Sequence, residues 1–247
     1  MNEKDIEKIK EIIKSSNKIV FFGGAGVSTA SGLKDFRGKD GLYLLKSKYN
    51  KSYEEMLSID YFEEYPETFY KFYKEFFLQK NDIEPNKAHY VLAEFEKKHN
   101  LKIITQNVDG LHQKAGSKNV IELHGSIEKN YCVKCHKNYS IDYVKQSIGV
   151  PYCTCGGIIR PGIVFYGEML DINNEINAEK AVNEADVLIV GGTSLKVYPA
   201  AGFVRLFHGK CLIIINNDYT DYDYLANYVF HEDIGNVLEK ILLWKMR

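Results

Sequence analysis

Four of the five cysteines lie between positions 132 and 155, in two close pairs that could hold a metal ion. The pairs are Cys132-x-x-Cys135 and Cys153-x-Cys155, and 17 residues separate them. Thiolates from two turns can complete a tetrahedron around zinc, and four thiolates leave no position for water. The spacing therefore predicts a structural zinc site rather than free thiols. Because the second pair is one residue short of C-x-x-C, His136 remains an alternative ligand.

One histidine, His124, stands directly after an apolar stretch at positions 120–123 that is typical of a buried strand. Period-two alternation along such a strand places Glu122 and His124 on the same side. An imidazole titrates near neutral pH, so His124 is a candidate general base. A hydrogen-bonded structural histidine is the alternative role.

A glycine-rich turn follows the first apolar stretch, where residues 19–22 run into Gly23-Gly24-Ala25-Gly26. The common dinucleotide fingerprint is G-x-G-x-x-G, with an acidic residue about 20 positions later. Here Thr29 occupies the third glycine position, and no acidic residue ends a second strand at that distance. Backbone amides at the start of a helix bind anions, so the first glycines still suit a pyrophosphate. The turn predicts a nucleotide site that differs from that of a dehydrogenase.

Short apolar strands alternate with helical patterns along most of the chain, and these elements must position the reactive groups. Continuously apolar strands are buried on both faces, which predicts an α/β fold with a Rossmann-like parallel sheet. Cys211 adjoins the last of these strands and is predicted to be buried with it. The predicted strands are residues 18–22, 101–105, 120–123, 187–190 and 212–215. The predicted helices are residues 4–14, 85–99 (opened by Pro85), 175–184, 198–208 and 234–245.

Each of the five predicted strands runs directly into glycine or polar residues. In open parallel sheets, ligands bind in the crevice beyond the carboxyl ends of the strands. One polar strand end is ordinary turn chemistry, but five on the same edge predict a binding crevice. These stretches are GGAG at 23–26, TQNVD at 105–109, HG at 124–125, GGTS at 191–194 and NND at 216–218.

Two stretches interrupt the alternation of strands and helices. Residues 46–82 have a helical pattern and are rich in Phe and Tyr, which form either the core of a small helical module or, in part, the lining of a cleft. Residues 127–160 carry the cysteine pairs. The expected organisation is a Rossmann-like domain, a helical module and a zinc-binding module, the last two forming a smaller lobe. The domain comprises residues 1–45, 83–126 and 161–247, and the modules comprise residues 46–82 and 127–160.

The overall composition argues against several classes of protein. The 247 residues carry a formal net charge of -1, so no electrostatic argument favours nucleic acid or an anionic membrane surface. No apolar run approaches the roughly 20 residues of a membrane span. The first residues lack the apolar core of a secretory signal, and clustered cysteines suit a metal in a reducing compartment. We therefore expect a cytoplasmic protein that binds neither nucleic acid nor membranes.

The chain resembles the sirtuins, which are NAD-dependent protein-lysine deacylases, in five blocks that occur in the family's order. GAGVSTASGLKDFRG is similar to their signature GAG-x-S-x-x-x-G-I-P-D-F-R. TQNVDGLHQKAG, ELHGS, RPGIVFYGE and GTSLKVYPAAG are similar to four further blocks. The cysteine pairs fall between ELHG and RPGIVFYGE, as they do in sirtuins. The resemblance covers residues 18–218 and is greatest to the undifferentiated bacterial branch.

This resemblance implies a reaction that consumes NAD as a co-substrate. In the family, the acyl-lysine oxygen attacks the ribose carbon that carries nicotinamide, and nicotinamide leaves. The histidine of the HG motif, here His124, then acts as general base on a ribose hydroxyl. The products are free lysine and O-acyl-ADP-ribose. The implied partners are acylated-lysine proteins or peptides, and one structural zinc per chain is implied beside NAD.

The matching positions also imply which residues bind each ligand. Phe36 would shield the reactive ribose, and Arg37 would order the loop over NAD. The peptide would enter as an extended strand. The residues implied for NAD are Gly24, Ala25, Gly26, Thr29, Phe36, Arg37, Gln106, Asn107, Val108, Asp109, His124, Gly192, Thr193, Ser194, Asn216 and Asn217. Those implied for the peptide are Val164, Phe165, Gly167, Glu168 and Val197.

Two departures from the family pattern bear on this function. Leu33-Lys34 replaces Ile-Pro before DFR, so a proline that would fix one dihedral angle is missing. Sirtuins that prefer acidic acyl groups carry Y-x-x-R in the helical module, whereas Tyr73 stands in place of the arginine here. We therefore expect acidic acyl groups to be disfavoured and acetyl to be preferred, with room for longer fatty acyl groups. Mono-ADP-ribosyl transfer, NAD hydrolysis and an NAD-binding sensor without turnover are the alternative functions.

Overall fold

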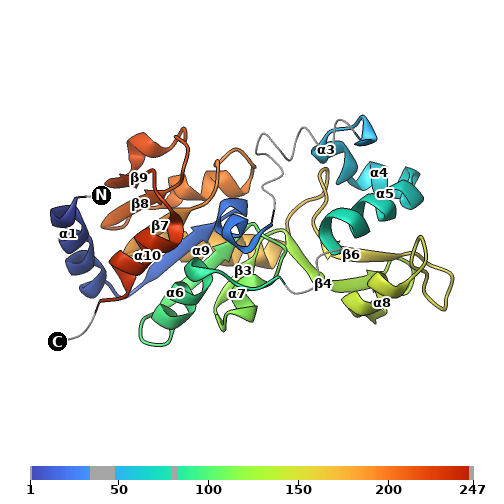
Figure 1. Ribbon diagram of the computed structural model, residues 1–247, viewed down its shortest axis with the longest axis horizontal. Helices are drawn as coiled ribbons and strands as arrows, with labels where there is room; N and C mark the ends of the chain where they lie inside the picture. Colours follow the sequence, from blue (N-terminus) through green and yellow to red (C-terminus); the bar gives the residue numbers. More distant parts are fainter. Residues whose placement is uncertain (1, 34–47, 79–82, 245–247) are drawn as a thin grey trace.

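The computed structural model describes residues 2–33, 48–78 and 83–244, which form a larger and a smaller lobe (Figure 1). The chain enters the smaller lobe twice, once with residues 48–78 and once with residues 125–163. The remaining described segments build the larger lobe, so both lobes are assembled from pieces that are distant in the sequence.

A six-stranded sheet forms the centre of the larger lobe, with the strand order β3-β2-β1-β7-β8-β9. All of its neighbouring strands are parallel, which confirms the predicted parallel sheet. The short edge strand β9 was not predicted. The strands are β1 (Ile19–Gly23), β2 (Leu101–Thr105), β3 (Val120–Glu122), β7 (Val187–Gly191), β8 (Cys211–Ile215) and β9 (Tyr228–Phe230).

Helices cover both faces of this sheet. Successive strand residues point to opposite faces, so Phe21 packs into one core and Phe22 into the other. The core around Phe21 is closed by α1 (Glu3–Lys14), α6 (Lys87–Glu96) and α10 (Ile234–Leu242). The core around Phe22 is closed by α9 (Ile172–Asn183) and the 3-10 segment η4 (Ala200–Leu206).

Two predicted helices differ from the observed ones. The helix predicted at 85–99 begins at Lys87, because Asn86 caps it by accepting the N–H of Ala88 at 2.9 Å. Pro85 therefore lies outside the helix and does not open it. The helix predicted at 198–208 is the 3-10 segment η4, a form that is common in short connecting pieces.

Residues 48–78 of the smaller lobe form short helices around an aromatic core. Phe69, Tyr70, Phe72 and Tyr73 are fully buried. They share one core cluster with Cys132 and other residues of the second insertion, so the two modules pack as a unit. Most of the aromatic residues therefore form a core. The helices are α3 (Tyr53–Met56), α4 (Ile59–Glu64), α5 (Pro66–Tyr73) and the π-helical turn η3 (Lys74–Leu78).

Residues 125–163 form a three-stranded antiparallel sheet with the order β5-β4-β6. Cys132 is the last residue of β4, and Cys153 and Cys155 lie in the turn before β6, so the cysteines meet beyond one end of this sheet. The elements are β4 (Gly125–Cys132), β5 (Asn138–Tyr139), α8 (Ile141–Gln146) and β6 (Ile159–Ile163).

The order of the large sheet reverses between β1 and β7, which are adjacent in space although β2 and β3 intervene in the sequence. Such a switch point leaves a crevice at the carboxyl ends of the strands. All five predicted polar strand ends lie at this edge, because the strands that precede them are parallel. The short segments that follow the strand ends are η1 (Ala25–Val27), η2 (Thr29–Ser31), α7 (Leu111–Lys114) and η5 (Asp223–Leu225).

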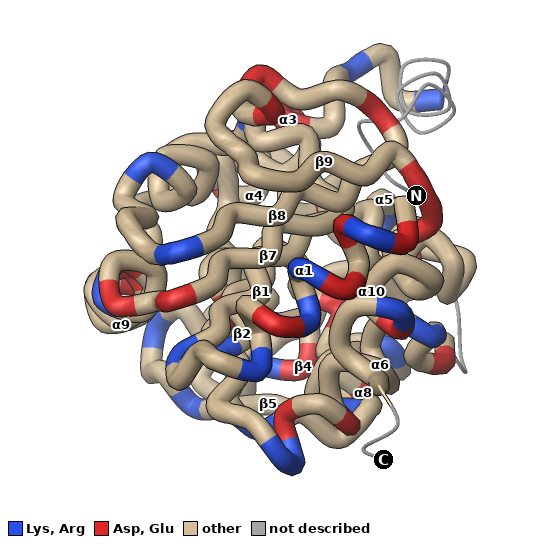
Figure 2. The backbone as a smooth tube through the Cα atoms, turned by 90° about the vertical axis from the view of Figure 1, so that its left-hand side faces the viewer, with Lys and Arg blue, Asp and Glu red and all other residues tan. Residues whose placement is uncertain are grey.

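Acidic and basic residues are interspersed along α1, as Figure 2 shows. Helix α1 begins after Asn2, whose side chain accepts the N–H of Lys4 at 3.1 Å, and it buries Ile9 and Ile13. Within the described ranges, every helix is too short or too polar to cross a lipid bilayer.

Candidate active site

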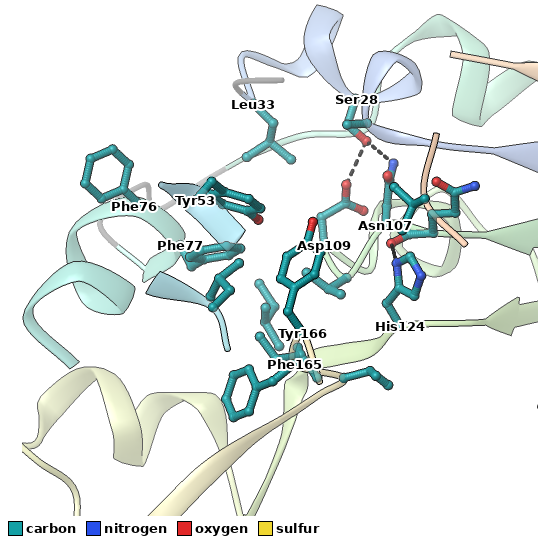
Figure 3. A pocket seen from close by; sticks show the side chains of 18 of the residues that line it. Ser28, Leu33, Tyr53, Phe76, Phe77, Asn107, Asp109, His124, Phe165 and Tyr166 are labelled. Carbon is teal, nitrogen blue, oxygen red and sulfur yellow. Dashed lines mark hydrogen bonds between the residues drawn. The ribbon is translucent and has the colours of Figure 1, made fainter. Parts of the chain in front are cut away.

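A cavity of about 460 Å³ lies where the smaller lobe faces the carboxyl ends of the sheet strands. Figure 3 shows Ser28, Asn107 and His124 on one side of it and Phe76 and Phe77 on the other. We call these sides the polar wall and the apolar wall. A cavity of this size is typical of sites for small molecules and cofactors.

The cavity brings together most of the predicted site residues. Gly24, Gly26, Thr29, Asn216 and Asn217 are not among its lining residues, although they follow β1 and β8 at the same edge of the sheet. Phe36 and Arg37, like Lys34, lie outside the residues that the structure describes. The predicted residues that line the cavity are Ala25, Gln106, Asn107, Val108, Asp109, His124, Val164, Phe165, Gly167, Glu168, Gly192, Thr193, Ser194 and Val197.

Ser28, which the predicted set omitted, is the centre of hydrogen bonding on the polar wall (Figure 3). Its hydroxyl donates to Asp109 Oδ2 at 2.7 Å and accepts from Asn107 Nδ2 at 3.1 Å. Burial raises the pKa of the Asp109 carboxyl, and hydrogen bonds from the Leu111 N–H and from Ser28 oppose this shift. The GAG-x-S signature contains Ser28, so the sequence held a signal for it.

His124 lies in the turn after β3, with its Nδ1 2.9 Å from the carbonyl oxygen of Gln106. A carbonyl oxygen can only accept, so Nδ1 carries the proton and Nε2 of the neutral ring carries the lone pair. The N–H of Val164 donates to the His124 carbonyl at 2.9 Å, which fixes the backbone as well. The ring is thus oriented to take a proton at Nε2, as a general base must.

The two glycine loops at the switch point pack directly against each other. The N–H groups of Gly24 and Gly26 donate to the carbonyls of Gly191 and Gly192, at 3.2 and 2.8 Å. A Cβ on Gly26 would lie 2.8 Å from the Cα of Gly192, so the contact has no room for a side chain. The N–H groups of Gly24 and Gly26 are thus hydrogen-bonded within the protein. Of this turn, Ala25 is the residue that lines the cavity.

Two further histidines are buried behind the polar wall. His89 Nδ1 accepts the N–H of Asn86 at 3.2 Å, which directs Nε2–H toward Ser28 Oγ at 3.5 Å. His112 packs against His89 with 4.8 Å between ring centroids, and neither of its ring nitrogens has a hydrogen-bond partner within the described ranges. Burial lowers the pKa of His89 to about 4 and that of His112 to about 3. Both rings are therefore neutral near pH 7.

The apolar wall comes mainly from the smaller lobe. Tyr53, Phe76 and Phe77 line it, so part of the aromatic stretch does face a cavity. Tyr73, which replaces the arginine of sirtuins that prefer acidic acyl groups, is instead fully buried and stacks on Phe69 at 5.6 Å. In this chain, Tyr73 is a core residue and not a lining residue.

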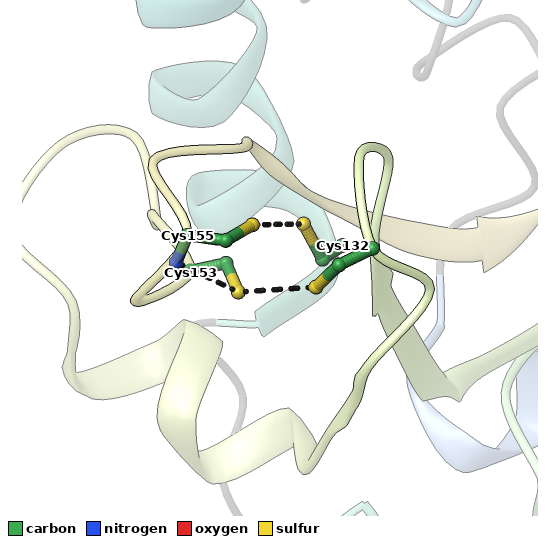
Figure 4. Close-up of side chains that lie close together, drawn as sticks. Cys132, Cys153 and Cys155 are labelled. Atoms are coloured by element: carbon green, nitrogen blue, oxygen red, sulfur yellow. Dashed lines mark hydrogen bonds between the residues drawn. The ribbon is translucent and has the colours of Figure 1, made fainter.

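The four predicted metal ligands form one group in the smaller lobe (Figure 4). Their sulfur atoms all lie within 4.8 Å of one another, and Cys132–Cys155 and Cys135–Cys153 are each 3.5 Å apart. Zn–S bonds of about 2.3 Å place the sulfurs of a tetrahedron roughly 3.8 Å apart, so the group fits zinc. The cysteines form no disulfide with one another, and the group does not include His136.

The polar wall also offers an unused hydrogen-bond donor. Gln106 Nε2 is buried and has no partner in the part of the chain that the structure describes, whereas Gln106 Oε1 accepts from Thr193 at 3.5 Å. A buried donor without a partner is destabilising until a ligand or water accepts from it. The ribose and phosphate oxygens of NAD are acceptors of the required kind, so the residues present fit this co-substrate.

Fold and site together define a class of protein: an α/β protein with its ligand cavity at the switch point of a parallel sheet and a four-cysteine module in a smaller lobe. The model of the Sir2 family matches residues 24–199. The chain belongs to the Sir2 family, which confirms the resemblance to sirtuins seen in the sequence.

Relatives and solved structures match nearly the whole chain. The NAD-dependent protein deacetylase of Clostridium perfringens is 52% identical over 240 residues, which cover 96% of this chain and 98% of that protein. The NAD-dependent protein deacetylase of Staphylococcus epidermidis is 48% identical over 244 residues, 98% of each chain. The structure of Sir2 with a p53 peptide and NAD+ is 39% identical, with a TM-score of 0.85 over 98% of this chain and 97% of that one. Sir2Tm bound to a propionylated peptide is 37% identical, with a TM-score of 0.85 over 96% of each chain.

Proposed function

We propose that this protein is an NAD-dependent protein-lysine deacetylase. Relatives at 52% and 51% identity are named NAD-dependent protein deacetylases. The observation in the structure that carries the proposal is the orientation of His124, whose Nδ1–H is held by the Gln106 carbonyl in the wall of the cavity. Nε2 would accept a proton from a ribose hydroxyl of the co-substrate. One water molecule would be consumed, and the products would be free lysine, nicotinamide and O-acyl-ADP-ribose.

NAD would lie along the polar wall, where it supplies an electrophilic ribose carbon and a nicotinamide leaving group. Gln106, Asn107, Val108 and Asp109 would shape the ribose and nicotinamide pocket, and the donor on Gln106 Nε2 supports this placement. We assign the remaining NAD contacts from the family motifs and, for the residues that the structure describes, also from the position of their loops at the same edge of the sheet. These residues are Gly24, Ala25, Gly26, Thr29, Phe36, Arg37, Gly192, Thr193, Ser194, Asn216 and Asn217.

The acylated peptide would enter as an extended strand between residues 165–168 and residues 195–197. Val164, Phe165, Gly167, Glu168 and Val197 all line the cavity, so both segments border the same opening. Pairing with exposed backbone at such an opening is β-augmentation. The acylated side chain would pass Val164 and Phe165, bringing its oxygen to the ribose of NAD.

The acyl group would contact the apolar wall. Tyr53, Phe76 and Phe77 extend this wall well beyond His124 (Figure 3), which leaves apolar surface for acyl groups longer than acetyl. Each buried methylene contributes about 0.8 kcal/mol, so longer fatty acyl groups would be accepted. Acidic groups would be disfavoured, because Tyr73 stands where sirtuins that prefer such groups carry an arginine. Of the two lysines that line the cavity, Lys114 and Lys145, the first is already paired with Glu84 at 2.8 Å.

The remaining features fit this function. The four cysteines would hold one zinc ion that is closed to water and stabilises the smaller lobe. The separate cores of the two lobes support a boundary between the NAD-binding domain (1–45, 83–126 and 161–247) and the smaller lobe. Within the smaller lobe, the helical module (46–82) and the zinc-binding module (127–160) would share one core. Cysteines without disulfides are typical of reducing compartments, which supports a cytoplasmic location.

The test is an acetyl-lysine peptide incubated with the protein, with and without NAD, and followed by mass spectrometry. We expect the peptide to lose its acetyl group only when NAD is present. No NAD-dependent deacetylation would refute the proposed function. ADP-ribose on the peptide would indicate a transferase instead, free ADP-ribose with an unchanged peptide would indicate a hydrolase, and NAD binding without any product would indicate a sensor.

A further inference from the structure

An ion pair between buried Arg160 and partly buried Glu168 holds the segment to which most of the peptide contacts are assigned. Arg160 in β6 is 9% exposed, and its Nη1 and Nη2 donate to the two carboxylate oxygens of Glu168 at 2.7 and 2.8 Å. In a bidentate pair of this kind, the guanidinium fixes the orientation of the carboxylate as well as its distance. The carboxylate that sequence analysis assigned to the peptide is therefore engaged within the protein.

The same two side chains hold the backbone of the segment. Arg160 Nη2 also donates to the carbonyl of Ile163 at 3.0 Å. Glu168 Oε2 accepts the N–H of Phe165 at 2.8 Å, and the N–H of Glu168 donates to the carbonyl of Phe165 at 3.0 Å. Arg160 thus bonds Ile163 at one end of residues 163–168 and Glu168 at the other end.

Arg160 packs against core residues of the smaller lobe, whereas the side chain of Glu168 is 25% exposed and lines the cavity. The guanidinium carbon lies 4.6 Å from the ring centroid of Phe165 and 5.5 Å from that of Tyr131, within the range of cation–π attraction. Burial disfavours a charged carboxylate, but the hydrogen bonds from Arg160 and the Phe165 N–H hold the pKa of Glu168 below its ordinary value. The pair is therefore ionised at neutral pH.

The held segment is connected to both sides of the cavity. The N–H of Val164 donates to the carbonyl of His124, as described above. The N–H of Tyr166 donates to the carbonyl of Leu57 at 2.9 Å, and the N–H of Ile59 donates to the carbonyl of Tyr166 at 3.0 Å. A change in the shape of residues 163–168 would alter the peptide side of the cavity most. On the NAD side, Gln106, Asn107 and Asp109 follow another strand, β2, although Val164 also contacts His124.

We propose that Arg160, acting through Glu168, is a positioning residue for the acylated peptide. The pair keeps residues 163–168 in the shape with which the peptide strand pairs, and neither charged group has to contact the peptide itself. The kinetic consequence of this inference rests on the proposed deacetylase function. The conformational consequence does not, so the two can fail separately.

The kinetic test uses Arg160→Lys, which keeps the charge but cannot form a bidentate pair, and Glu168→Gln, which keeps an acceptor for the Phe165 N–H. We expect the KM for an acetyl-peptide to rise about tenfold in both variants while the KM for NAD stays within about twofold. Lys18→Gln is the matched control, because it removes the exposed pair between Lys18 and Glu184 at 2.9 Å. A parallel rise of both KM values would show general damage and would overturn the inference, as would an unchanged peptide KM.

The conformational test is hydrogen exchange of the substrate-free proteins, which needs no activity. We expect the amides of Phe165 and Tyr166 to exchange faster in both variants than in the wild type or in Lys18→Gln, while Ile189 in the central sheet stays protected. Unchanged exchange at Phe165 and Tyr166 would overturn the inference even in an active enzyme. If the wild type proves unable to deacetylate the peptide, the proposed function fails and this exchange measurement still decides the role of the ion pair.

Discussion

The polar and apolar walls of the cavity come from lobes that are stabilised in different ways. The polar wall stands on the ends of a parallel sheet whose strands β1, β7 and β8 are buried along their whole length. The apolar wall stands on a cluster of aromatic rings that shares its core with two of the grouped cysteines, Cys132 and Cys153. One wall is thus supported by the apolar core of the sheet, and the other depends on a site that fits zinc.

This difference separates two parts of the chemistry. Groups that would handle charge and protons, such as Asp109 and His124, lie on the polar wall, away from the cysteine group. The rings of Phe76 and Phe77, which would receive an apolar chain, lie on the wall that the cysteine group supports. A substitution that disrupts one wall should therefore leave the structure of the other wall intact. The following predictions test that separation.

Loss of the metal should have the largest effect, and the effect should be confined to the smaller lobe. Structural zinc contributes about 10 kcal/mol or more to the folding of small zinc domains. We expect Cys132→Ser or chelation to abolish deacetylation and to expose residues 125–163 to hydrogen exchange, while strands β1 and β7 stay protected. Cys211→Ala is the control, because Cys211 lies outside the group and should leave the metal content unchanged. Simultaneous loss of protection in both lobes would contradict the separation.

Removal of the candidate general base should have the next largest effect, on the opposite wall. We expect His124→Ala to lower the kcat of deacetylation about 10²- to 10⁴-fold and to leave protection of the smaller lobe intact. The exposed His208→Ala serves as the control in the same steady-state assay. Undiminished turnover of His124→Ala would contradict the assignment of His124 as the general base.

The buried histidines behind the polar wall should make the larger lobe sensitive to acid. Their pKa values are lowered from 6.5 to about 4 for His89 and about 3 for His112, so the unfolded chain binds more protons below pH 6.5. The contribution of the two neutral histidines to the free energy of unfolding is therefore fully present above pH 6.5, and it is lost as the pH falls toward the lowered pKa values. We expect His112→Leu to remove on the order of 3 kcal/mol of the stability change between pH 7 and pH 4, as measured by urea unfolding. An unchanged pH slope, equal to that of His208→Leu, would contradict the burial of a neutral ring.

A substitution on the apolar wall should have the smallest effect and should change only selectivity. We expect Phe77→Ala to lower the ratio of kcat/KM for a longer fatty acyl peptide to that for the acetyl peptide about tenfold. Tyr65→Ala is the matched control, since Tyr65 belongs to the same module but is 47% exposed and does not line the cavity. An unchanged ratio for Phe77→Ala would mean that the acyl chain does not use this wall.

The sequence predicted those features that depend on local patterns. The spacing of the four cysteines was sufficient to predict that they form one group, because the spacing of metal ligands reflects the turns that hold the metal. These cysteines are Cys132, Cys135, Cys153 and Cys155. Runs of apolar residues were sufficient to predict five strands of the sheet. Parallel strands necessarily place their polar carboxyl ends at one edge.

The sequence could not predict contacts between distant residues or the direction of side chains in irregular segments. The hydrogen bond of Ser28 to Asp109 and the bond of Asn86 to Val27 join residues far apart in the chain. Tyr73 ends a helix that continues as a π-helical turn, and the direction of its side chain depends on the aromatic core around it. Glu168 illustrates the same limit, because the motif located the residue but did not reveal that Arg160 engages its carboxylate.

The most direct test of whether the two walls serve one reaction is the ratio in which its products form. Purified protein is incubated with NAD and an acetyl-lysine peptide, and free nicotinamide, free lysine peptide and acetyl-ADP-ribose are measured at successive times. We predict that the three products form in equal amounts, because the charge chemistry of the polar wall and the acyl group on the apolar wall meet in a single reaction. Release of nicotinamide in excess of free lysine, or ADP-ribose attached to the peptide, would contradict it.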